Sequence, residues 1–262
     1  MHFYKYSGSG NDFLLVNNLD GKYRPRISYI KNWCKRREGV GADGVIFIEN
    51  SNEHDYSMRI WNADGSEAEM CGNAARSSIH FAHHILKLGK EKYYFETMNG
   101  DYEGRPLEGD MVEVKMTELY DVDKINISDF STKGALYCNT GVPHAVIQVN
   151  NVEDINIHSL GRMIRNDVRF PNGTNVDFLE VVDHKNQVIK LRVYERGVED
   201  ETLCCGTGIM AAAVTCRKLM GWSGEITVHA KGGKLSAVVD DKLENLYFQG
   251  EVKMVFEGQI ND

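Results

Sequence analysis

The chain has 262 residues, of which 42% are hydrophobic, and its formal net charge is −8. This length suffices to bury a large core and is typical of two domains. The acidic balance argues against the basic surface that nucleic-acid binding requires, and no apolar run approaches the ~20 residues that span a bilayer. We therefore expect a globular protein with neither a nucleic-acid nor a membrane partner.

The cysteines indicate a reducing compartment. None of the six forms a CxxC pair or a disulfide-scaffold spacing: Cys34, Cys71, Cys138, Cys204, Cys205 and Cys216. The N-terminal sequence MHFYKYSGSGND passes directly from strand-like alternation into a polar turn, unlike a signal peptide. We therefore expect a cytoplasmic protein.

The first half of the chain predicts strands followed by one long helix. Strands are expected at residues 3–8, 13–18, 44–49, 56–62, 92–104 and 111–116. Residues 27–37 predict a short amphipathic helix. Residues 72–88 predict the long helix, with Gly89 as a left-handed stop.

The second half repeats this order. Strands are expected at residues 135–149, 175–182, 189–197, 225–239, 243–250 and 251–258. The helix is expected at 206–220, closed by Gly221, and residues 119–134 read as the crossover. The pattern predicts an α+β fold of two similar domains, 1–118 and 119–262, from an internal duplication. Each is a curled, mostly antiparallel sheet around one long central helix, and the end of the chain is compatible with packing back on the first domain.

Each half carries a thiol at the start of its long helix. Cys71 and Cys205 both precede a glycine, and an aspartate, Asp43 or Asp177, lies twenty-eight residues before each of them. An arginine lies twelve residues before the first cysteine (Arg59) and thirteen before the second (Arg192). Two thiols that approach one small molecule from opposite sides can invert a carbon centre, so the pattern predicts an epimerase.

The residues that follow each thiol are typical of an anion-binding site. Unpaired N–H groups at a helix N-terminus lower the pKa of a thiol and bind carboxylates. Gly72 and Asn73, like Gly206 and Thr207, leave such groups accessible. A single free cysteine is more often a small buried residue, but the duplicated pair favours catalysis.

Other chemistry-bearing residues are less specific. His144 and Glu195 are candidate general-base partners of the thiols, although such residues also serve as structural or surface groups. His80 and His84 have a metal-ligand spacing, but HFAHH contains no glutamate, so we predict no metal site.

Six motifs stand out along the chain: SGSGNDFLLVNN, GVGADGVIF, WNADGSEAEMCGNAAR, NTGVPH, PNGTNVDF and ERGVEDETLCCGTG. Together they resemble the diaminopimelate epimerase family over essentially the whole chain, and NADGSEAEMCGNAAR is highly specific. The resemblance implies a two-domain fold with the active site in the interdomain cleft and no cofactor. It also implies conversion of LL-diaminopimelate to the meso form, for lysine and peptidoglycan synthesis.

The resemblance also implies residue roles. Cys71 and Cys205 would act as base and acid on opposite faces of the substrate α-carbon, with Cys204 as packing. His144 would tune the first thiol and Glu195 the second. The implied substrate-binding residues are Asn11, Asn62, Gly72, Asn73, Asn175, Glu195, Arg196, Gly206 and Thr207.

Two departures leave the substrate open. Many members have asparagine where this chain has Val142, and glutamine where it has Gly44. A related two-cysteine racemase is therefore an alternative; Asn73 argues against the proline type, while Val142 leaves the histidine type open. A non-catalytic or isomerase relative would usually lose one cysteine. The sequence is compatible with a homodimer, and ENLYFQG (244–250), which matches a viral-protease site, is interpreted as native and protected by folding.

Overall fold

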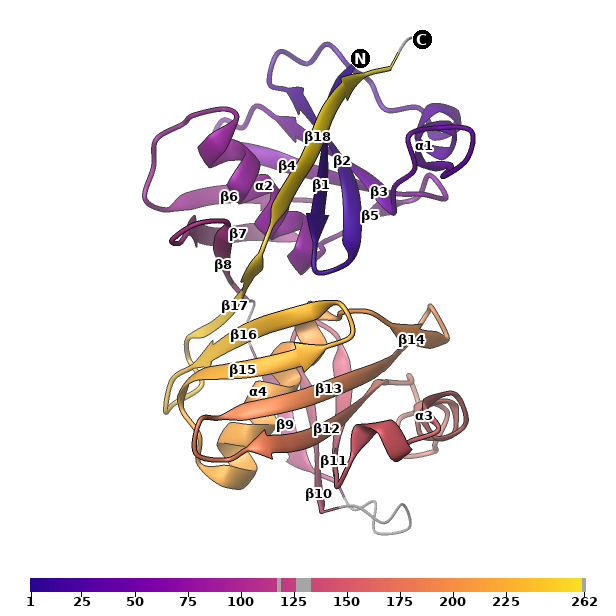
Figure 1. The fold of residues 1–262 in the computed structure, drawn as a ribbon, viewed down its shortest axis with the longest axis vertical. Coiled ribbons are helices and arrows are strands. Elements are labelled where there is room, and N and C mark those ends of the chain that lie inside the picture. The colour runs from indigo at the N-terminus through magenta and orange to yellow at the C-terminus, as the bar shows by residue number, and fades with distance from the viewer. Residues whose placement is uncertain (117–118, 126–132, 261–262) are drawn as a thin grey trace. The chain divides into compact units, whose positions relative to one another are not determined.

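The structure, a computed structural model, describes residues 1–116, 119–125 and 133–260. It divides into two compact units. Unit 1 comprises Met1–Val114 and Gly250–Asp262, and unit 2 comprises Lys115–Gln249. Each unit is a curled sheet around a long central helix, α2 in the first and α4 in the second (Figure 1). The predicted α+β class with two similar halves is confirmed.

Unit 1 is formed by the following elements: β1 (His2–Gly8), β2 (Asn11–Asn18), α1 (Ile27–Cys34), β3 (Gly44–Glu49), β4 (Tyr56–Asn62), β5 (Glu67–Ala68), α2 (Gly72–His84), β6 (Tyr93–Thr97), β7 (Gly100–Pro106), β8 (Met111–Lys115) and β18 (Lys253–Gln259). Strand β18 pairs antiparallel with β1, which places the end of the chain in unit 1. Most pairs are antiparallel, but β2–β3 and β4–β6 are parallel.

Unit 2 has the matching order: β9 (Tyr120–Lys124), β10 (Gly134–Asn139), β11 (Pro143–Val149), a 3-10 turn (Val152–Asp154), α3 (Ile157–Arg165), β12 (Asn175–Asp183), β13 (Val188–Glu195), β14 (Asp200–Thr202), α4 (Gly206–Met220), β15 (Gly224–Ala230), β16 (Gly233–Val239) and β17 (Leu246–Glu251). Its parallel pairs, β11–β12 and β13–β15, correspond to those of unit 1. The topology is therefore duplicated strand by strand.

The two arginines noted in the sequence occupy equivalent places. Arg59 makes a bidentate ion pair with Glu67, at 2.7 and 2.9 Å. Arg192 repeats the ion pair with Glu201 at the same two distances. Each clamps the long strand to the short strand that leads to the thiol.

The two aspartates are not equivalent in register. Arg59 pairs with Phe47 of β3, and Arg192 with Phe178 of β12. Asp177 directly precedes Phe178, inside β12, whereas Asp43 lies just before β3 begins. The equal spacing of twenty-eight residues is thus a coincidence of loop lengths.

The central helices are buried on every side. Residues 73–82 of α2 and 208–216 of α4 are all buried, because small residues on these helices let the sheets wrap closely around them. The largest polar side chain among them is Arg76, fully buried, which donates to Asn73 Oδ1 (2.7 Å), Ser9 Oγ (3.0 Å) and the Glu251 carbonyl (3.1 Å).

The predicted bounds are right for α4, but α2 and α1 end earlier than predicted. Helix α4 spans the predicted residues, and Gly221 is left-handed at φ 76°. Helix α2 begins as predicted but ends at His84, not at residue 88. The Leu86 amide bonds to the Phe81 carbonyl and Lys87 adopts φ 53°, which unwinds the last turn before Gly89. Helix α1 likewise ends at Cys34, because Lys35 is extended.

Helix α3 and strands β5, β9 and β14 were not predicted. In α3 the buried residues are Ile157, Gly161 and Ile164. Gly161 weakens the helical signal, yet it is required because a Cβ there would lie 2.6 Å from Tyr194 Cβ. Strand β9 lies in the expected crossover, of which residues 126–132 are outside the described residues.

The ENLYFQG segment forms part of β17. Leu246 and Phe248 are buried, at 3% and 0% exposure, so a protease that must grip the extended segment needs local unfolding first. We expect the native chain to resist the viral protease and the chain unfolded in mild denaturant to be cut. Gel electrophoresis over time checks this, and native cleavage as fast as that of an ENLYFQG-tagged control would contradict it.

Candidate active site

Both thiols lie at helix N-termini. Cys71 is the N-cap of α2 and Cys205 the N-cap of α4, each with extended backbone. Each carbonyl accepts the first helical hydrogen bond, from Ala75 and Ile209, at 2.9 Å. The glycine that follows each thiol starts the helix, so backbone N–H groups of the first turn face the region of the sulfur.

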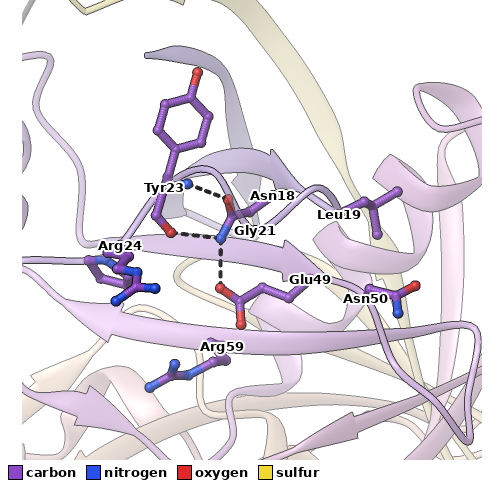
Figure 2. Close-up of a pocket in the computed structure, with 9 residues that line it drawn as sticks. Asn18, Leu19, Gly21, Tyr23, Arg24, Glu49, Asn50 and Arg59 are labelled. Atoms are coloured by element: carbon purple, nitrogen blue, oxygen red, sulfur yellow. Dashed lines mark hydrogen bonds between the residues drawn. The ribbon is translucent and has the colours of Figure 1, made fainter.

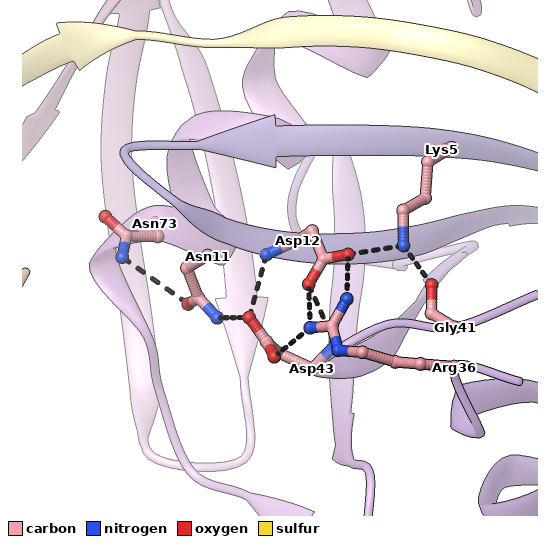
Figure 3. Close-up of polar contacts among 7 residues, drawn as sticks. All are labelled: Lys5, Asn11, Asp12, Arg36, Gly41, Asp43 and Asn73. Carbon is pink, nitrogen blue, oxygen red and sulfur yellow. Dashed lines mark hydrogen bonds and ion pairs between the residues drawn. The ribbon is translucent and has the colours of Figure 1, made fainter. Parts of the chain in front are cut away.

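In unit 1, Asn11 lies beside the thiol. Its Oδ1 is 3.7 Å from Cys71 Sγ and 3.4 Å from Asn73 Nδ2. Its Nδ2 donates to Asp43 Oδ2 at 2.8 Å (Figure 3). Two predicted binding residues, Asn11 and Asn73, are therefore gathered at the first turn of α2 with Cys71.

A charged network stands behind Asn11 (Figure 3). Arg36 donates to Asp43 Oδ1 (2.7 Å) and Asp12 Oδ1 (2.8 Å), and the buried Lys5 pairs with Asp12 Oδ2 at 2.6 Å. Burial alone would raise the pKa of Asp12, but hydrogen bonds from Arg36 and Lys5 outweigh it and hold that pKa well below its usual range. Asp12 is thus firmly ionised.

In unit 2, a hydrogen-bonded chain runs to the thiol. Asp177 Oδ2 lies 2.7 Å from His144 Nδ1, and His144 Nε2 lies 2.9 Å from Thr207 Oγ1. Thr207 Oγ1 is 3.3 Å from Cys205 Sγ. The histidine and aspartate side chains are both fully buried. Gly208 packs on this chain, since a Cβ there would lie 2.4 Å from Asp177 Oδ1.

Glu195 completes the electrostatics of unit 2. Burial raises the pKa of Glu195, while the nearby Thr202 and His144 side chains oppose the rise. Burial, then the charges of Glu195 and Asp177, raise the pKa of Cys205 well above its usual value, against the hydrogen bonds that Cys205 makes with Thr207 and with the Gly208 backbone. The helix N-terminus was expected to lower this pKa, but burial outweighs it, so Cys205 rests as a thiol.

The other predicted substrate-binding residues, Asn175, Arg196 and Asn62, form hydrogen bonds within turns and loops. Asn175 donates to the Pro143 carbonyl (3.0 Å) and accepts from the Arg196 amide (2.8 Å), which ties the β10–β11 turn to the end of β13. Arg196 donates to the Asn172 carbonyl at 3.2 Å. Asn62 donates to Ser66 Oγ at 3.0 Å on the surface of unit 1. The assignment of His144 to Cys71, across the two units, stays a prediction.

Two residues of the candidate site were not predicted from the sequence. Gly208 and Thr202 contact the Asp177 and Glu195 side chains, and the CCGTG motif was the available signal for the glycine. The departure at Gly44 has a structural basis, because a Cβ there would lie 2.5 Å from the Trp61 carbonyl oxygen. A glutamine at this position requires the backbone to shift.

A separate pocket of about 500 Å³ lies in unit 1 (Figure 2). It is lined by Asn18, Leu19, Gly21, Tyr23, Arg24, Pro25, Glu49, Asn50 and Arg59, none of them a predicted site residue. Glu49 accepts from the buried Asn18 at 2.7 Å, and Arg59 is engaged by Glu67. The charges of Glu49 and Arg59 thus serve the fold.

The histidines of α2 have other partners. His80 Nδ1 lies 3.2 Å from the Tyr6 hydroxyl and Nε2 lies 3.4 Å from Asp110. Within the described residues, no three His, Cys, Asp or Glu side chains gather in a way that would hold a metal ion. In that same part of the chain, every helix is too short or too polar to cross a bilayer.

Comparison with known proteins identifies similar chains. The family model for diaminopimelate epimerase matches residues 3–120 and 136–255. Diaminopimelate epimerase of Aquifex aeolicus is 36% identical, covering 100% of this chain and 98% of its own length. That of Campylobacter jejuni serotype O:2 is 37% identical, covering 100% of this chain and 99% of its own.

Solved structures share the fold. A PhzF-family phenazine biosynthesis protein from Bacillus anthracis has a TM-score of 0.74 at 16% identity, covering 100% of this chain and 99% of that chain. A predicted epimerase from Pseudomonas aeruginosa has a TM-score of 0.70 at 12% identity, covering 99% and 98%. At such identities the likeness is one of architecture.

Proposed function

The chain belongs to the diaminopimelate epimerase family, and on that premise we propose that it converts LL-diaminopimelate to meso-diaminopimelate without a cofactor. The observation that carries the proposal is the thiol at the N-cap of each central helix. The reaction would serve lysine and peptidoglycan synthesis in the cytoplasm, where free thiols stay reduced.

The proposed reaction moves two protons. One cysteine, as thiolate, removes the α-hydrogen as a proton, and its electron pair is delocalised onto the α-carboxylate. The other cysteine, as thiol, delivers a proton to the opposite face of the carbon, which inverts it. Backbone N–H groups at the helix starts, Gly72–Asn73 and Gly206–Thr207, would stabilise the charge that develops on the carboxylate.

Further residues support the two thiols. Glu195 would exchange a proton with Cys205, since its charge already acts on that thiol. His144 would serve as a second base. Asn11, Asn62, Asn175 and Arg196 would bind the remaining polar groups of the diamino diacid.

A histidine racemase is the second candidate, and Val142 is the observation that favours it. Chiral chromatography of LL-diaminopimelate, L-histidine and L-proline after incubation with the enzyme separates the candidates. We expect inversion of diaminopimelate alone; inversion of histidine alone would overturn the proposed substrate. Loss of all three activities would favour a non-catalytic relative.

Val142→Asn tests the substrate-binding departure. Val142 lies in the β10–β11 turn, where its carbonyl accepts from the Thr140 amide at 3.2 Å. An added amide that bonds the substrate should contribute about 1 kcal/mol, which lowers KM for diaminopimelate roughly fivefold. Steady-state kinetics check this, with Val168→Asn, at a 94% exposed position, as control. A higher KM would mean that the pocket has been rebuilt around valine.

A further inference from the structure

Each unit holds a carboxylate directly behind a polar side chain that faces the thiol helix. In unit 1 the carboxylate is Asp43 and the side chain is Asn11; in unit 2 they are Asp177 and His144. Both side chains are ambiguous by themselves, since an amide can flip and a neutral imidazole has two tautomers. A carboxylate, which only accepts hydrogen bonds, removes that ambiguity.

In unit 1, every bond to Asp43 comes from a donor. Asp43 Oδ2 accepts from Asn11 Nδ2 and from the Asp12 amide at 3.0 Å, and Oδ1 accepts from Arg36. A flipped Asn11 would set its carbonyl oxygen against this carboxylate. The amide nitrogen of Asn11 therefore faces Asp43, and its Oδ1 faces the sulfur of Cys71 and Asn73 Nδ2.

In unit 2, Asp177 accepts from Nδ1 of the imidazole. A neutral His144 then carries its proton on Nδ1 and offers Nε2 as an acceptor to the Thr207 hydroxyl. The Thr207 oxygen in turn is free to accept from the thiol of Cys205. The remaining oxygen of Asp177 has no hydrogen-bond partner within the described residues and packs at Gly208, where the N-terminal dipole of α4 offsets its charge.

We propose that Asp43 and Asp177 are positioning residues, one per unit, which fix the hydrogen-bonding face that Asn11 and His144 present to the thiol helix. The proposal deepens the proposed function and rests on it. Asp43 bonds to Asn11 and Asp177 to His144, so each acts on the thiol helix through the side chain it orients. The charge of Asp177 also adds to the effect of burial, which raises the pKa of Cys205. The equal sequence spacing does not carry the argument, since the two aspartates differ in register.

The ring proton of His144 is the most direct readout. In the 15N-labelled full-length protein, whose nine histidines are assigned by loss of single signals, we expect His144 to be protonated at Nδ1. A neutral His144 with its proton on Nε2 would overturn the assignment for unit 2. This measurement needs no substrate, so it stands even if the enzyme acts on another amino acid.

The imidazole of His144 lies among polar groups from each packed element. These are Asp177 on β12, Glu195 on β13, Cys138 on β10, and Cys205 with Thr207 on α4. Asp177→Asn should shift the proton of His144 towards Nε2 and lower kcat roughly 10²- to 10⁴-fold, with a smaller change in KM. Asp183→Asn, at the far end of the same strand, makes the same charge change and should alter neither.

A double-mutant comparison shows whether Asp43 acts by orienting Asn11 or independently of it. If Asp43 acts through Asn11, Asp43→Leu should lower kcat about 10²-fold, and adding Asp43→Leu to Asn11→Leu should cause little further loss. Asp20→Asn, in the loop beyond the far end of β2, is the control and should keep wild-type kinetics. Additive losses in the double variant, or an unchanged kcat in Asp43→Leu, would contradict the role in unit 1.

The two proposals fail separately. A wild-type enzyme that leaves diaminopimelate unchanged would contradict the proposed function, while the Nδ1 proton of His144 would still support the positioning role of Asp177. Normal epimerisation by Asp177→Asn would overturn that positioning role and leave the function intact.

Discussion

Replacing Cys71 or Cys205 by serine is expected to lower the rate of epimerisation at least about 10³-fold. A serine hydroxyl is a far weaker acid than a thiol, so it supplies neither the base nor the proton at neutral pH, and each such proton transfer contributes roughly 10²- to 10⁴-fold. The substitution is nearly isosteric. Cys205 is only 9% exposed, yet the oxygen can keep the contact with Thr207, so stability should change little.

The measurement is the initial rate of meso-diaminopimelate formation from the LL form, with thermal unfolding to confirm the fold. Cys204→Ser is the matched control, because it changes the adjacent cysteine without touching the N-cap. It should retain the wild-type rate. If either N-cap variant does so as well, that thiol takes no part in the reaction.

Glu195→Gln is expected to lower kcat about 10²-fold. Burial, then the charge of Glu195, raises the pKa of Cys205, so the thiol needs a nearby acceptor for its proton before it can act as a base. Glutamine cannot receive that proton, which leaves Cys205 as a thiol. Glu108→Gln, exposed in the turn between β7 and β8, is the control, and an unchanged kcat in Glu195→Gln would remove the carboxylate from the mechanism.

The pH dependence follows from the raised pKa of Glu195, whose largest cause is burial. The folded state holds this proton to higher pH than the unfolded chain does. Wild-type stability relative to Glu195→Gln should therefore fall as pH rises from the unfolded value of about 4.3 to the folded pKa, and stay level beyond it. The acid limb of kcat/KM should likewise lie above the ordinary glutamate range. A limb at or below that range would contradict the burial effect.

Local sequence patterns predicted the elements that carry the thiols. Gly206 and Gly221 bound α4 as expected, because small apolar residues and a left-handed glycine have strong local preferences. The end of α2 was wrong by about one turn, since Lys87 leaves the helix before Gly89. Helix α3 was missed because Gly161 is there to fit Tyr194, a tertiary reason with no local signature.

The contacts within the site could not be predicted in the same way. His144 meets Asp177 because β11 and β12 pair in parallel, with His144 opposite Asn175. That register is set by the whole sheet. The raised pKa of Cys205 also depends on burial and on two carboxylates from other strands. Motifs therefore identified the reactive residues, while their electrostatic state required the fold.

The fate of the α-hydrogen tests the two-thiol mechanism most directly. The enzyme is incubated with LL-diaminopimelate in deuterated water, and early in the reaction both isomers are separated and analysed by mass spectrometry. Two thiols on opposite faces predict one deuterium in the meso product and none in the remaining LL substrate. Meso product that retains its original hydrogen would show that a single group removes and returns the proton, and would contradict the account.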